Sequence, residues 1–154
     1  MHSELFARTM QSLELDATYG AYFPHIPGST LATVNLVTMF GLHRRLRGAL
    51  VGHLAVFEMT SVTPMQRYSR ALERMGIDGN ARRFYDVHVI ADEFHQEIAL
   101  HQLVAGLVDD EPTVGADVVF GARAVMQVEA AFARHLLDSW AGGVSSLLST
   151  QRDR

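Results

Sequence analysis

Three side chains that could bind a metal ion recur at helical spacing in the segment FYDVHVIADEFHQEIALHQ, residues 84–102. They are His88, Asp92 and His95. At 100° per residue these positions fall within about 60° of one another, so they share one face of a helix. Burying a carboxylate and two imidazoles without partners is costly, so this face is expected to bind something.

The neighbouring residues predict that this face points inward. Phe94 and Ile98 flank it, whereas the acidic residues Glu93 and Glu97 lie roughly opposite. An apolar flank with an acidic back is typical of an amphipathic helix. We therefore expect the polar face to be buried together with its apolar neighbours.

The spacing favours two metal ions over one. His88 and His95 lie about 10 Å apart along the helix axis, because each residue adds about 1.5 Å. Two ions about 3.5–4 Å apart, with Asp92 near the middle and one imidazole toward each end, use this geometry better than a single ion does. The simpler alternative is a pair of core histidines hydrogen-bonded to neighbouring helices, with Asp92 paired to an arginine.

Two further residues are candidate ligands. Glu58 is the only acidic residue between Asp16 and Glu73 and ends an apolar stretch, although it could equally be a partly exposed residue at a helix end. His2 begins an amphipathic segment. The chain has no cysteine, so nitrogen and oxygen ligands favour iron or manganese, while zinc also fits by ligand type.

The composition predicts one compact, cytoplasmic domain. A chain of 154 residues with 48% hydrophobic residues is long enough to bury a core. We expect a single helical metal-binding domain over residues 1–143 and a flexible tail over residues 144–154. A net charge of −4 without any lysine argues against nucleic-acid binding, and neither a membrane span nor a signal peptide is evident.

Helical periodicity runs through nearly the whole chain, which predicts an all-α protein. The connection at residues 19–29, with Pro24, Pro27 and Gly28, is expected to be non-helical. The stretch at 30–59 is expected to be a long, mostly buried helix with a kink near Gly41. The other predicted helices cover residues 3–15, 63–76, the segment of the polar face, and 112–140.

Several motifs together resemble a known family. HxxxDxxH within FYDVHVIADEFH follows the Glu of FEMTS by thirty residues, and MHSELF, LDATYGAY and PGSTLATVNL extend the likeness over most of the chain. This pattern resembles the heme-oxygenase-like diiron oxidases, in particular the branch of iron-containing redox enzymes. The resemblance implies a heme-oxygenase-like helical bundle, two Fe(II) ions and dioxygen as co-substrate. It implies metal ligation by His2, Glu58, His88, Asp92 and His95.

The chain departs from the family pattern at its beginning. Members of the family carry a ligand Glu about three helical turns before the first His, on a helix that is itself preceded by another. Here the chain begins at Met1. We therefore expect a member that lacks the leading helices and whose catalysis is impaired. The apolar face left by those helices would predict a homodimer.

The resemblance implies an oxygen-activating oxidoreductase for a small organic substrate, such as an amine, an amino acid or a fatty acid, with a separate electron donor. Two other functions stay open from the residues alone. One is a non-catalytic helical interaction protein, in which His88, Asp92 and His95 form a buried hydrogen-bonded network. The other is a haem-binding helical protein.

Overall fold

The computed structural model describes residues 2–149, and these residues form only helices and their connections. The all-α prediction is confirmed. The contacts divide the chain into two compact units. Unit 1 holds the residues up to Ala21 together with Phe57–Gln102, and unit 2 holds Tyr22–Val56 together with the residues from Leu103 on. The prediction of one domain over residues 1–143 stays a prediction.

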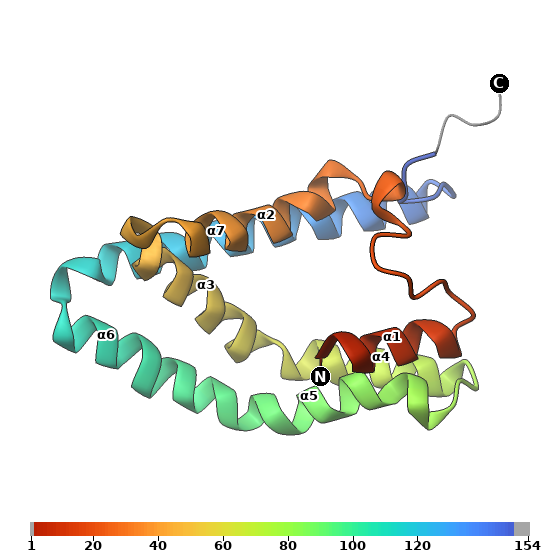
Figure 1. Ribbon diagram of the computed structural model, residues 1–154, viewed down its shortest axis with the longest axis horizontal. Coiled ribbons are helices and arrows are strands. Elements are labelled where there is room, and N and C mark those ends of the chain that lie inside the picture. Colours follow the sequence, from red (N-terminus) through yellow and green to blue (C-terminus); the bar gives the residue numbers. More distant parts are fainter. Residues whose placement is uncertain (1, 150–154) are drawn as a thin grey trace. The chain divides into compact units, whose positions relative to one another are not determined.

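Unit 1 is built on α5, Gly79–Ile98 (Figure 1, green). This helix begins after Asp78, whose side chain accepts hydrogen bonds from the backbone N–H groups of Asn80 and Ala81 and so caps the first turn. It carries the predicted polar face. Beyond Ile98 the chain continues as a π-helical segment, Ala99–Val104, which the periodicity did not predict.

Helix α1, His2–Ser12, runs antiparallel to α5. The buried Thr9 hydroxyl donates to the Ala81 carbonyl at 2.8 Å, and one turn away Phe6 meets the Phe84 ring edge-on with centroids 5.1 Å apart. As residue numbers rise along α1, their partners on α5 fall. Thr9 and Phe6 share one helical face, and His2 continues it, so this face brings His2 to α5.

Helix α4, Val62–Arg74, lies along another side of α5 and is also antiparallel to it (Figure 1). Ser69 donates to Asp86 at 2.5 Å, and Arg82 pairs with Glu73 at 2.7 Å. The helix ends just before Gly76, whose φ of +72° is a conformation that glycine adopts without strain. The predicted end at Gly76 is therefore confirmed, and α1 and α4 together hold α5.

Unit 2 contains α2, Gly28–Leu42, and α7, Gly115–Ala141, which lie side by side (Figure 1). It also contains most of α3, Arg47–Thr60, and the short helix α6, Ala105–Asp110.

Two glycines let α3 and α7 touch backbone to backbone. A Cβ on Gly52 would overlap the carbonyl oxygen of Val118, and a Cβ on Gly121 would overlap the carbonyl oxygen of Ala49. Both positions therefore require glycine.

The prediction of one long helix over residues 30–59 is wrong. His43 is extended, with φ −113° and ψ 103°, and a 3₁₀ turn follows it before α3 begins. Gly41 and Gly48 on either side weaken the helix by about 1 kcal/mol each relative to alanine, so a break here costs little. The expected burial is also wrong for α2. Its apolar residues point in all directions, and among them only Phe40 is buried.

The carboxyl-terminal segment carries two carbonyl groups that histidines contact. The His135 ring donates to the Ser146 carbonyl at 2.8 Å, and His25 donates to the Leu148 carbonyl at 3.1 Å. The flexible tail predicted for residues 144–154 remains a prediction, and residues 150–154 lie outside the described part of the chain. No helix among the described residues has the length and apolar character needed to cross a membrane.

Candidate metal centre

The five residues singled out from the sequence line one cavity of about 270 Å³ in unit 1. They come from three helices. The last turn of α3 supplies one carboxylate, α5 supplies the three residues of its polar face, and α1 supplies its first residue. In chain order they are His2, Glu58, His88, Asp92 and His95.

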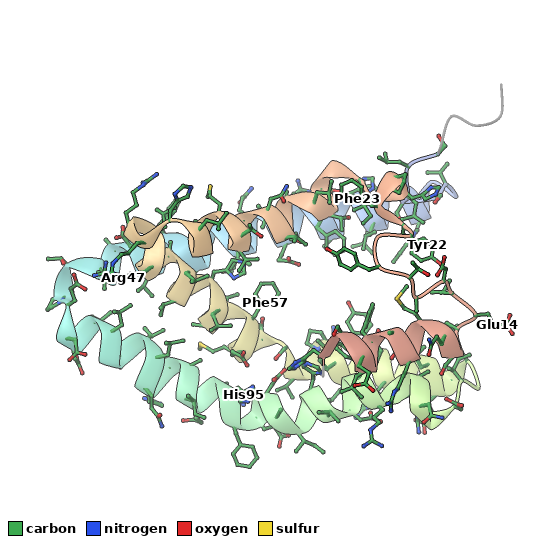
Figure 2. The ribbon with its side chains drawn as sticks, viewed as in Figure 1. Glu14, Tyr22, Phe23, Arg47, Phe57 and His95 are labelled. Carbon is green, nitrogen blue, oxygen red and sulfur yellow. The ribbon has the colours of Figure 1, made fainter. Side chains whose placement is uncertain are left out.

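Three of these residues form a tight cluster. The Nδ1 atom of His95 lies 3.1 Å from Oε2 of Glu58 and 3.2 Å from Oδ1 of Asp92. One ligand atom from each of the three residues falls within 4.8 Å of the others. Asp92 is only 5% exposed, whereas the His95 side chain is about half exposed, so the cluster has a buried and an open end. Figure 2 labels His95 on α5 and Phe57 on α3.

The other two imidazoles lie together. The rings of His2 and His88 have centroids 5.0 Å apart at an interplanar angle of 57°. The Nδ1 atom of His88 lies 2.6 Å from the Phe84 carbonyl, which can only accept, so Nδ1 carries the hydrogen. In the neutral ring this leaves the Nε2 lone pair free. A backbone carbonyl that fixes one ring nitrogen is the usual support of a metal-binding histidine.

The charge around the cluster is one-sided. Glu58 and Asp92 converge on the same imidazole nitrogen, which carries at most one hydrogen for two carboxylate oxygens. The described residues that line the cavity include no arginine, and the chain has no lysine. Within residues 2–149 the alternative that Asp92 pairs with an arginine is wrong, because its contacts there are Ser61 and His95. Two carboxylates beside three imidazoles form a donor set that fits a ferrous ion.

Five lining residues are not among the predicted ligands: Phe57, Ser61, Met65, Val87 and Ala91. Ser61 donates from Oγ to Oδ2 of Asp92 at 2.6 Å, and Phe57 and Met65 form part of the apolar wall. A signal for two of them exists in the spacing. Ser61 and Met65 follow Glu58 by three and seven residues, which is one helical face, and Ser61 keeps helical φ and ψ between α3 and α4.

The apolar residues expected to be buried beside the polar face are exposed. Phe94 is 69% exposed and Ile98 is 47% exposed. Periodicity predicted which residues share a side of α5, and the acidic back is solvent-exposed as expected. The predicted width of the buried side of α5 was wrong, because α1 and α4 cover only part of the circumference of this helix.

The comparisons with known proteins place these observations in a family. The model of the family described as iron-containing redox enzyme matches residues 1–130, which is most of the chain. No curated protein and no solved structure matches the chain. The match covers all five residues of the candidate centre, and it confirms the resemblance drawn from the motifs.

Proposed function

This chain belongs to the iron-containing redox enzyme family, and we propose that it is an iron-dependent oxidoreductase that uses dioxygen to oxidise a small organic substrate. We propose further that it binds two ferrous ions and takes electrons from a separate donor. The fold is all-helical and heme-oxygenase-like, in keeping with the family.

One observation carries the proposal. Glu58 and Asp92 converge on His95 in a partly buried cluster, and no arginine lines its cavity in the part of the chain that the structure describes. Two carboxylates held so close repel each other and need a nearby positive charge. A divalent cation among the three ligand atoms supplies that charge and suits their oxygen and nitrogen chemistry.

The five residues divide naturally between two ions. Glu58, Asp92 and His95 would hold one, and the paired imidazoles of His2 and His88 would bring nitrogen ligands toward a second. Asp92 lies one turn from each of the two histidines on α5, so it stands between the two groups of ligands.

The remaining walls of the cavity suit an apolar part of a substrate. Phe57, Met65, Val87 and Ala91 line it beside the ligands. Bound iron would supply the reductive activation of dioxygen, a reaction open to a centre with nitrogen and carboxylate ligands. The chain itself would orient the substrate against these side chains, exclude water with them, and hold the His88 proton on Nδ1 through the Phe84 carbonyl.

The test is iron loading under anaerobic conditions, followed by removal of loose metal and metal analysis. We expect about two iron atoms per wild-type chain. His88→Ala and Asp92→Ala should each lower the iron content clearly, because each removes a ligand. His101→Ala is the matched control, since His101 follows the same helix but is exposed and does not line the cavity.

The same experiment separates the proposal from the interaction-protein alternative. A hydrogen-bonded network of His95 with the two carboxylates needs no metal. Wild-type protein that retains almost no iron, or iron content equal in wild type, His88→Ala and Asp92→Ala, would favour the network over the enzyme.

A further inference from the structure

Ser61 occupies the corner where α3 gives way to α4. It follows Thr60, the last residue of α3, and precedes Val62, the first of α4. Its φ of −75° and ψ of −34° are helical, so its side chain continues the face of Glu58. From this corner the hydroxyl reaches across to α5 and donates to Oδ2 of Asp92 at 2.6 Å.

This hydrogen bond is short and directed. A distance of 2.6 Å is in the range of hydroxyl donors to charged carboxylates, which are about twice as strong as neutral hydrogen bonds. The same hydroxyl lies 3.4 Å from the Glu58 carbonyl, which is too far to compete well for its single hydrogen. The Ser61 proton is therefore committed to Asp92.

The consequence for Asp92 is that its two oxygens have different tasks. Oδ2 is occupied by Ser61, while Oδ1 faces Nδ1 of His95 at 3.2 Å. A carboxylate held at one oxygen cannot rotate freely about its terminal torsion, which is otherwise broad. Ser61 thus sets the direction in which Oδ1 points.

We infer that Ser61 is a positioning residue for the metal centre, which holds the Asp92 carboxylate so that Oδ1 faces the same point as the ligand atoms of Glu58 and His95. This inference rests on the proposed function. Partners that orient metal ligands in this way commonly change metal affinity by about 10- to 100-fold when they are removed.

The chain offers an internal control. Ser69 of α4 donates to Asp86 of α5 at 2.5 Å, so α5 carries a second aspartate that accepts from a serine. This pair lies away from the cavity that the five residues line. Removing the Ser69 hydroxyl therefore perturbs the packing of α4 on α5 without touching the candidate centre.

The test uses cobalt(II), whose visible absorption reports its ligand geometry, bound to the full chain in competition with a chelator. Ser61→Ala should weaken cobalt binding by about 10- to 100-fold and alter the visible spectrum of the bound ion. Ser61→Thr keeps the hydroxyl and should restore both toward wild type. Ser69→Ala should leave both unchanged.

Each other outcome has a definite meaning. Wild-type affinity and spectrum in Ser61→Ala would overturn the inference alone. Equal weakening in Ser61→Ala and Ser69→Ala would also overturn it, because it would assign the effect to helix packing. Wild-type protein that binds no cobalt and no iron would overturn the proposed function, and the inference with it.

Discussion

Burial lowers the pKa of His53, which lies on α3 in unit 2 and is only 4% exposed. Its ring meets the buried ring of Phe40 edge-on, with centroids 6.1 Å apart. The folded protein therefore favours the neutral imidazole, whereas the unfolded chain takes up a proton near the ordinary pKa of 6.5. The unfolded state binds more protons as the pH falls, so acid destabilises the fold through this residue.

We expect the free energy of unfolding to fall as the pH is lowered below 6.5, and the fall to be smaller in His53→Gln. Urea unfolding at pH 7.5 and pH 5 measures both. Burial raises the pKa of Glu129, which acts in the opposite direction but is present in both proteins, so the difference between their slopes isolates His53. His43→Gln is the control, because His43 is exposed.

An equal loss of stability between pH 7.5 and pH 5 in wild type and His53→Gln would contradict the conclusion that His53 causes the acid destabilisation. The conclusion would be supported if the loss in wild type equals the loss in His43→Gln and exceeds the loss in His53→Gln. The comparison depends on slopes, so it holds even if His53→Gln lowers stability at both pH values.

The sequence indicated the candidate ligands more clearly than the groups that hydrogen-bond to those ligands. His88, Asp92 and His95 are chemically distinctive and recur at helical spacing, so their common face could be read directly. Ser61 follows Glu58 by three residues, which suggests a shared face, but serine is common and the sequence does not show its hydrogen bond to a partner thirty-one residues away. The Phe84 carbonyl carries no side-chain signal at all.

Among the elements, the crossing of α3 and α7 depends most on single residues. Gly52→Ala would place a methyl group against the Val118 carbonyl, a rigid backbone atom. We expect the free energy of unfolding, measured by chemical denaturation, to fall by about 1–3 kcal/mol or more, because α3 and α7 must move apart.

Gly41→Ala is the control for this substitution. Gly41 lies near the end of α2, and nothing lies within 4 Å of an added Cβ. The free energy of unfolding of Gly41→Ala should stay the same or rise by up to about 1 kcal/mol, since alanine is the better helix former. Similar effects of Gly41→Ala and Gly52→Ala would contradict a close contact between α3 and α7.

The elements themselves were largely predictable, because helix type follows from periodicity and helix ends follow from residues such as Asp78 and Gly76. The sequence predicted a kink near Gly41 but not the extended residue at His43, because no proline marks that position. The π-helical segment Ala99–Val104 was also missed, because such segments are rare and the apolar pattern predicts helix without distinguishing its type.

For the whole molecule, α5 presents an outward apolar stripe that bears on assembly. Its members follow one another by four residues and are each 47–69% exposed: Ile90, Phe94 and Ile98. A row of this spacing is the pattern by which two helices pack together. The homodimer expected from the sequence therefore stays a prediction, now with a surface to test.

Sedimentation equilibrium measures the outcome. We expect twice the mass of one chain for wild type and the mass of a single chain for Phe94→Glu, because a charge in the row disfavours burial. Glu93→Gln, on the adjacent acidic side, should remain dimeric. A single-chain mass for wild type, or a dimer of Phe94→Glu, would argue against pairing through this stripe.

The glycine crossing also bears on how this protein can be altered. At Gly52 and Gly121 the neighbouring backbone occupies the space of any side chain, so each of the other nineteen amino acids meets the same obstacle. A library that places every amino acid at each position should therefore tolerate no substitution at these two positions of unit 2, although the cavity lies in unit 1. Selection for catalysis alone would mark these glycines as essential, and only a separate measurement of folded protein would reveal that they contribute architecture rather than chemistry.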